Sequence, residues 1–289
     1  MSATLIGYFD SHFLPRKTVR WSKNTERLHR VALRHLERFL ARPPALADLN
    51  DDTLSSFLSW RLQSVSCMTA NRDVEKLLTL WRFAAKRNDV AKFPTVEFAI
   101  EPKRVPRAWS RDDLKKLFAA IDSLDGYVGK VPSRKWWRCL LLCLFDTGER
   151  IGAILGLEWQ DVDLERQWIV CRAEHRKGRK SDRSYKLAVD TVAELGPISK
   201  SHGKVFDWPL DKTLLWKYYG RILVSAGLPD DRRSKFHRIR RSTASHAKAA
   251  GADPQQLLDH VSRATTLLYL DPTICQEASA IDYLFRPGN

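Results

Sequence analysis

The sequence lacks any long hydrophobic run. Its longest apolar stretch, Leu140 to Phe145, is far too short to span a bilayer, and the N-terminus carries no apolar signal core. We therefore expect no membrane partner. Recruitment to an anionic membrane surface stays an alternative without specific support.

Cysteine is scarce, and low-complexity tracts are missing. The five cysteines are scattered and odd in number, which favours a reducing cytoplasm over a disulfide framework. Cys139 and Cys143 are one helical turn apart, but no histidine or further cysteine stands nearby at ligand spacing. This pair therefore indicates core packing rather than a zinc site.

Positive charge is in excess. Lys and Arg number 49 against 34 Asp and Glu, giving a formal net charge of +15 and a pI near 9.8. Such an excess favours a polyanionic partner, either nucleic acid or an anionic membrane surface. The length of 289 residues suits two domains, each with its own core.

The first hundred residues predict a small helical domain. Apolar residues at helical spacing predict helices over 24–40, from Asn50 to Leu62, and from about Thr69 to Ala84. Basic residues lie between the apolar ones on the first and third helices. They indicate either a solvated charged face or a cationic face for phosphates, and the net charge favours the second. These residues are Arg27, Arg30, Arg34, Arg38, Arg72, Lys76, Arg82, Lys86 and Arg87.

A basic segment with two prolines, 101–107, predicts a linker, and a capping box at 110–113 opens the next helix. We expect domains at 1–100 and 109–289, joined by 101–108. In the second domain a helix over 136–145 breaks at Gly148, and Arg150 opens a new helix over 151–155. Two strands and two later helices complete a mainly α fold with a small antiparallel β-sheet (α+β). Their ranges are 168–171, 184–189, 192–195 and 214–224.

The chain is organised around a stretch near its end. His237 and Arg240 are three residues apart, so they share one face of a helix that should stop at Gly251. Helix restarts at 253–254 and at 262 then bring His260 and Tyr269 back towards that face. A cation, two imidazoles and a phenol suit chemistry on a phosphodiester. The Asp-Pro pair at 271–272 ends the segment and is expected to leave it free to move.

Four motifs in order carry a family resemblance. His237-x-x-Arg240, Leu258-x-His260 and Tyr269 nine residues later, together with Arg150 in the segment 146–151, resemble the tyrosine recombinases (phage-type integrases). Taken singly, His237 fits a surface histidine and Tyr269 a half-buried core tyrosine. The resemblance implies an N-terminal helical core-binding domain that clamps DNA and a C-terminal integrase-type catalytic domain.

The resemblance also implies roles. Tyr269 would be the nucleophile that forms a 3′-phosphotyrosine, and Arg150 and Arg240 would hold the phosphate oxygens. Lys177, favoured over Lys180 on the basic turn, would be the general acid. His237 would assist as base or donor, and His260 would donate to the phosphate.

No metal, ATP or cofactor is implied. The implied partners are double-stranded DNA and three further copies of the chain, in a homo-tetramer on paired sites. The expected location is the cytoplasm, with the nucleoid.

Two departures from the family pattern stand at the site. Ala153 occupies a position that is usually acidic, three residues after the first arginine, so a support for the site is missing or supplied elsewhere. Asp259 replaces the usual glycine before the second histidine. Its carboxylate would either favour protonated His260 or cap a helix.

Alternatives to a recombinase remain. A type IB topoisomerase and a hairpin-forming resolvase share the chemistry, and an integrase relative that has lost turnover would bind DNA only. The alternating carboxylates of Asp161, Asp163 and Glu165 would suit a metal nuclease, although an acidic turn before a strand explains them better. Tyr283 competes with Tyr269 as nucleophile. The apolar tail that holds it would dock on a neighbouring subunit or on its own domain.

Overall fold

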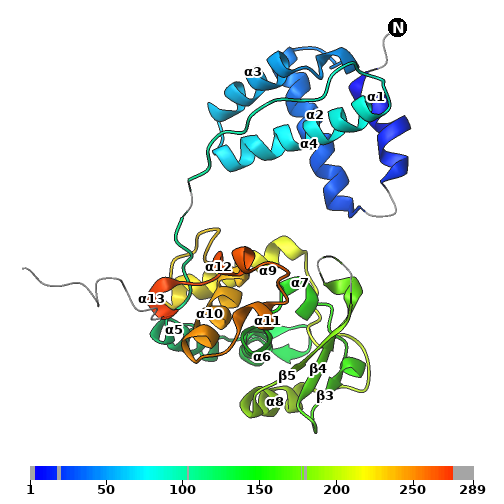
Figure 1. Cartoon of the computed structure of the whole chain (residues 1–289). Helices are drawn as coiled ribbons and strands as arrows, with labels where there is room; N and C mark the ends of the chain where they lie inside the picture. Colours follow the sequence, from blue (N-terminus) through cyan, green and yellow to red (C-terminus); the bar gives the residue numbers. More distant parts are fainter. Residues whose placement is uncertain (1–3, 18–20, 103, 177, 179–180, 276–289) are drawn as a thin grey trace, which may run out of the picture. The chain divides into compact units, whose positions relative to one another are not determined.

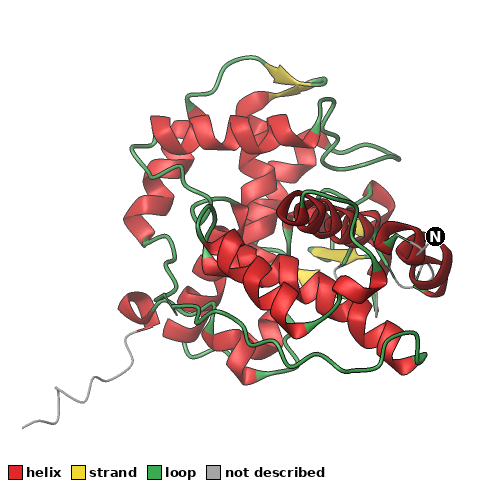
Figure 2. Cartoon of the chain, turned by 90° about the horizontal axis from the view of Figure 1, so that it is seen from above, coloured by secondary structure: helices red, strands yellow, loops and turns green. Residues whose placement is uncertain are grey.

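The computed structural model describes residues 4–17, 21–102, 104–176, 178 and 181–275. The chain divides into two compact units, 1–103 and 104–289, and each has its own hydrophobic core. Helices dominate both units, and strands are short (Figures 1 and 2). Across the described ranges, no helix is both long and apolar enough to cross a bilayer.

The first unit is helical. Its main helices pack around buried Leu36, Phe57, Leu77 and Trp81. Side-chain caps fix two helix starts, because Ser22 accepts from the Thr25 N–H and Asn50 from the Thr53 N–H. The three long predicted helices are confirmed. The elements are α1 (Leu5–Tyr8), α2 (Lys23–Leu40), α3 (Asp51–Leu62) and α4 (Cys67–Lys86).

Basic side chains of α2 and α4 are divided between solvent and ion pairs. Arg30 pairs with Asp10 and Glu26, and Arg87 pairs with Asp89, so these two are already neutralised. Seven others are exposed and available to a polyanion: Lys23, Arg27, Arg34, Arg38, Arg72, Arg82 and Lys86.

The second unit surrounds α6 (Ser133–Thr147), whose Trp136, Leu140 and Leu144 are buried. Helices α5 (Arg111–Asp122), α8 (Val189–Leu195) and α10 (Phe236–Ala249) pack against it (Figure 1). The capping box predicted at Ser110 and Asp113 opens α5. The other helices are α7 (Ile151–Ile154), α9 (Lys212–Ser225), α11 (Pro254–Leu258), α12 (Arg263–Leu267) and α13 (Pro272–Cys275).

Two small antiparallel sheets complete this unit. Strands β3 (Val162–Asp163), β4 (Trp168–Cys171) and β5 (Arg183–Lys186) form one, in that order, with Ile169 opposite both Val162 and Tyr185. Strands β1 (Tyr127–Val128) and β2 (Val131–Pro132) form the other.

The predicted fold class is confirmed and β4 is correct, with two differences. The second predicted strand ends at Lys186 rather than Val189, because Ala188 is already the N-cap of α8. A single sheet was expected, but β1 and β2 form a second one. Two-residue strands have no alternating pattern long enough to be read from sequence.

Gly148 sets the break between α6 and α7. It is the left-handed C-cap of α6, with φ of 61°, and its N–H donates to the Leu144 carbonyl. A Cβ at this position would lie 3.1 Å from the Leu258 side chain and 3.3 Å from that of Thr243. This position therefore needs glycine both for its backbone conformation and for its close neighbours.

We expect Gly148→Ala to destabilise the second unit by about 1–3 kcal/mol from backbone strain, and further through its contacts with Leu258 and Thr243. Gly129→Ala is the matched control, because Gly129 has a similar φ of 59° but nothing within 4 Å of an added Cβ. Calorimetric unfolding of the whole chain measures both variants. Equal losses would show that packing around Gly148 contributes nothing.

Candidate active site

Side chains from two segments converge on Tyr269, which lies two residues after α12 and is half-buried. The His237 ring centroid lies 5.0 Å from that of Tyr269, and the His260 centroid lies 4.8 Å away. The guanidinium carbon of Arg240 is 5.5 Å from the centre of the same ring. A phenol is thus surrounded by two imidazoles and a cation.

Helix α10 presents His237 and Arg240 one turn apart, as the sequence predicts. His237 is exposed, whereas Arg240 is only 2% exposed. The Arg240 guanidinium donates to the Gly148 carbonyl, to the Leu258 carbonyl at 2.7 Å and to His260 Nε2 at 3.2 Å. One buried charge thereby ties α10 to the α6–α7 break and to the end of α11.

The hydrogen bonds of His260 define its tautomer. A guanidinium can only donate, so His260 Nε2 accepts from Arg240 and the ring proton is on Nδ1. Nδ1 lies 3.2 Å from the hydroxyl of Thr266, which sequence reasoning had not singled out. Burial, with the charges of Arg240 and Arg150, lowers the pKa of His260 to about 4. The expected donation from His260 to phosphate is therefore not available at Nε2 in this arrangement.

Arg150 is the N-cap residue of α7 and is half-buried. After burial, its charge is the main cause that lowers the pKa of Arg240 below the ordinary arginine value. Two neighbouring guanidinium groups form a natural site for an anion. Arg150 therefore belongs to the same cluster as Arg240, His260 and Tyr269.

Glu149 is a functional residue that the sequence analysis missed. Its carboxylate is 2% exposed and accepts from Tyr185 Oη at 2.7 Å, Arg176 Nε at 2.7 Å and the Arg150 N–H at 2.9 Å. Its Oε2 also lies 3.8 Å from the Arg240 guanidinium. An acidic residue directly before a candidate site arginine was the one signal that could have found it.

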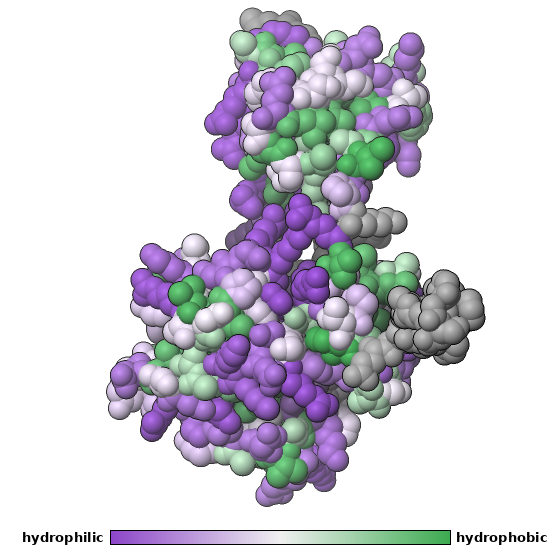
Figure 3. Space-filling model, turned by 90° about the vertical axis from the view of Figure 1, so that its left-hand side faces the viewer, coloured by the Kyte–Doolittle hydropathy of each residue, from purple (hydrophilic) through white to green (hydrophobic). Residues whose placement is uncertain are grey.

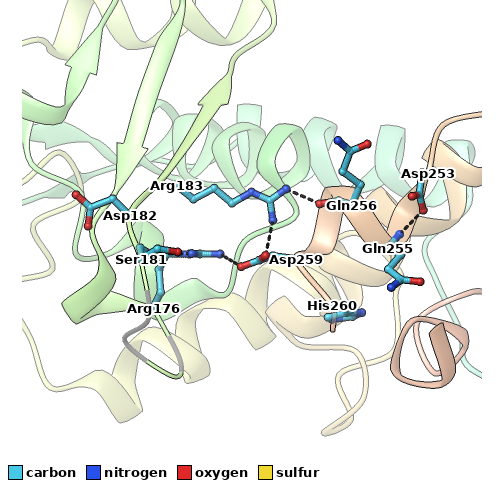
Figure 4. A pocket seen from close by; sticks show the side chains of 9 residues that line it. All are labelled: Arg176, Ser181, Asp182, Arg183, Asp253, Gln255, Gln256, Asp259 and His260. Carbon is cyan, nitrogen blue, oxygen red and sulfur yellow. Dashed lines mark hydrogen bonds and ion pairs between the residues drawn. The ribbon is translucent and has the colours of Figure 1, made fainter. Parts of the chain in front are cut away.

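Asp259 corrects one expectation. It ends α11 in the left-handed conformation, with φ of 54°, and its carboxylate accepts from Arg176 at 2.7 Å and lies 3.7 Å from Arg183. Asp259 thus occupies the C-cap position of α11, but its carboxylate binds arginine rather than capping a helix. The Asp259 carboxylate faces the two arginines (Figure 4). It favours protonated His260, but burial and the charges of Arg240 and Arg150 outweigh it and lower the pKa of His260.

An open polar pocket lies between the β4–β5 hairpin and α11, next to His260 (Figure 4). Its lining residues are Arg176, Ser181, Asp182, Arg183, Asp253, Gln255, Gln256, Asp259 and His260. Lys177 and Lys180 lie outside the described residues, as does Tyr283.

The remaining candidates are differently placed. Asp161 precedes β3 and accepts from Arg172 Nε at 2.7 Å, so the expected strand face of alternating carboxylates does not form. Asp271 is 2% exposed, its carboxylate accepts from the Ala108 N–H at 2.8 Å, and its own N–H donates to Ser245 Oγ at 2.9 Å. The segment after Tyr269 is therefore anchored here rather than left free.

We expect the His260 imidazole to titrate near pH 4 rather than near 6.5, because burial, Arg240 and Arg150 disfavour its charged form more than Asp259 favours it. The fold should lose stability as pH falls from about 6.5 to about 4, since the unfolded chain takes up this proton first. NMR titration of labelled imidazoles measures the midpoint, with His260→Gln for assignment. A midpoint at or above 6.5 would contradict this account.

The sequence model of the Phage integrase family matches residues 108–274. Tyrosine recombinase XerA of Thermococcus kodakarensis is 27% identical over 242 residues, covering 78% of this chain and 79% of the relative. Tyrosine recombinase XerC of a Mycobacterium species (strain JLS) is 26% identical over 278 residues, covering 88% and 90%.

Solved structures share the fold. A lambda integrase tetramer bound to a Holliday junction superposes with a TM-score of 0.73 at 16% identity, covering 96% of this chain and 80% of that one. A lambda integrase dimer on a core site gives a TM-score of 0.71 at 17% identity, covering 96% and 97%. Because the family match spans more than half of the sequence, this chain belongs to the phage integrase family of tyrosine recombinases.

Proposed function

We propose that this protein is a site-specific DNA recombinase that cleaves and rejoins strands through a 3′-phosphotyrosine at Tyr269. The observation that supports this most strongly is the convergence of His237, His260 and Arg240 on the Tyr269 ring. A weakly acidic phenol needs cations and a proton acceptor to become a nucleophile, and this cluster supplies both.

In the proposed reaction, Tyr269 Oη attacks the phosphorus and passes its proton to His237. The bond from phosphorus to the 5′ oxygen breaks, and Lys177 protonates that oxygen as it leaves. Arg150 and Arg240 neutralise the charge that develops on the non-bridging oxygens. The 5′ hydroxyl of another strand then attacks the phosphotyrosine and restores Tyr269. Bond energy is conserved, so ATP is not required, and the two arginines supply the charge neutralisation that a metal would otherwise provide.

His260 acts differently in this scheme from the role that the family resemblance implies. As a neutral ring that accepts from Arg240, it orients the guanidinium for the phosphate. Its own Nδ1 is directed to Thr266, which keeps Nε2 facing Arg240.

The proposed partner is double-stranded DNA. The first unit serves as the core-binding domain, because seven basic side chains on α2 and α4 are exposed and available to phosphates. Hydrophilic side chains also cover much of the second unit on the face that Figure 3 shows. Four copies would assemble on two paired sites, as lambda integrase does on a Holliday junction. The proposed location is the cytoplasm, with the nucleoid.

We expect Tyr269→Phe to bind DNA normally and to form no covalent adduct, because it loses only the attacking oxygen. Tyr283→Phe is the matched control and should still be trapped. The measurement is an SDS-stable complex on a nicked duplex that carries the native site, followed by peptide mapping. Nucleotide found on Tyr283, or full activity of Tyr269→Phe, would refute the mechanism, and binding without any adduct in the unchanged chain would indicate a non-catalytic relative.

Lys177→Ala should slow strand cleavage by about a hundred- to ten-thousand-fold, the usual contribution of a general acid, with little effect on binding. A substrate with sulfur at the 5′ bridging position has a better leaving group and should restore most of the rate. Single-turnover cleavage of both substrates tests this. If Lys180→Ala shows the rescue instead, the acid is Lys180.

A further inference from the structure

Glu149 is surrounded by hydrogen-bond donors. Tyr185 and Arg176 donate to Oε1, the Arg150 N–H donates to Oε2, and the Arg240 guanidinium lies 3.8 Å from Oε2. A carboxylate that is 2% exposed would be costly without such partners, so these contacts hold the group in one orientation. Both candidate phosphate-binding arginines thereby have the same fixed neighbour.

The ionisation of Glu149 agrees with this geometry. Burial raises the pKa of its carboxyl, but hydrogen bonds from Tyr185, the Arg150 N–H and Arg176 outweigh burial and hold the pKa below its ordinary value. The group is therefore charged throughout the neutral range. It is the carboxylate nearest to Arg240 in the part of the chain that the structure describes.

Arg176 extends the network to the other side of the site. Its side chain, 9% exposed, joins Glu149 to Asp259, and it also donates to the Ser181 carbonyl at 2.9 Å. Asp259 immediately precedes His260, and Leu258 before it accepts from Arg240. One guanidinium thus links the β4–β5 hairpin, the segment before Arg150 and the segment that carries His260 (Figure 4).

Charge balance fits a phosphodiester. Among the described side chains of this network, Arg150, Arg176, Arg183 and Arg240 oppose Glu149 and Asp259, with His260 neutral. The network therefore keeps a net positive charge, which attracts the single negative charge of a phosphodiester. The carboxylates reduce repulsion between the arginines without competing fully for the anion.

We propose that Glu149 is a positioning residue for strand cleavage, acting through Arg240 and the Arg150 main chain, and that Arg176 couples it to Asp259. Position 153, where the family resemblance expects an acid, holds a buried alanine, so the carboxylate is supplied from the residue before Arg150 instead. One ion network thus accounts for both departures from the family pattern: Glu149 replaces the acid that is missing at Ala153, and Asp259 is itself a member of the network. The inference rests on the proposed recombinase function.

The test compares cleavage and binding in Glu149→Gln. A glutamine amide would place its NH2 group among donors in either orientation, so Arg240 and Arg150 should lose their fixed placement. Misplacement of about 1 Å can cost about a hundred-fold in rate. We expect cleavage of a nicked site to slow by about ten- to a hundred-fold, while DNA affinity stays equal or rises, because one negative charge has been removed.

Glu165→Gln is the matched control, since Glu165 is exposed outside this network, and it should cleave at the normal rate. Cleavage at the unchanged rate in Glu149→Gln would overturn the inference, as would equal losses of cleavage and binding, which indicate a purely structural role. If the unchanged chain forms no adduct, it is the recombinase function that fails.

If Glu149→Gln does not fold, Asp259→Asn provides a second test. The Asp259 side chain is 57% exposed, so its replacement creates no buried cavity. The single variant should slow cleavage several-fold through Arg176. Where Glu149→Gln does fold, the double variant should lose less rate than the two single losses combined, since both act through one guanidinium. A normal rate in Asp259→Asn, or strictly additive effects, would remove Arg176 as the coupling group.

Discussion

The buried charge of Arg240 is the constraint on which the second unit's site depends. A guanidinium at 2% exposure is costly unless its donors find partners, and the two terminal nitrogens of Arg240 find three acceptors in two separate segments. These acceptors are the carbonyls of Gly148 and Leu258 and the imidazole of His260. The α6–α7 break and the end of α11 are therefore brought to the same helix that carries His237.

The left-handed backbone conformation at Gly148 and at Asp259 helps to place acceptors within reach of the Arg240 guanidinium. Gly148 turns the chain so that its carbonyl faces Arg240, and Asp259 ends α11 so that His260 follows in reach of the same group. Both positions have positive φ, and both lie beside a hydrogen bond to Arg240. The backbone conformation at these two positions thus helps to satisfy the hydrogen-bond donors of Arg240.

The carboxylates of Glu149 and Asp259 neutralise part of the positive charge of the arginine cluster. Without these carboxylates, three arginines would repel each other in a partly buried site. This repulsion would destabilise the fold in the absence of DNA. With them the site is organised in the free protein, which lowers the cost of orienting groups during reaction. The anchoring of Asp271 by Ala108 and Ser245 likewise holds the chain on the far side of Tyr269.

The sequence by itself determined the helices with strong periodicity and clear caps, such as α2, α5 and the restarts at Asp253 and Ser262. It also determined which residue types could act, because local spacing places His237 and Arg240 on one face. Capping and periodicity are local properties, so they can be read without a fold. The short strands β1, β2 and β3 carried too few residues for such a pattern.

Only the tertiary structure decided how charges are paired. The protonation of His260, the orientation of Asp259 towards Arg176 and the burial of Glu149 depend on residues 20 to 110 positions apart in the chain. The sequence showed these residues as individual polar side chains, with no sign of which were buried. Burial and long-range contacts set pKa values and hydrogen-bond partners, and neither is a property of local sequence.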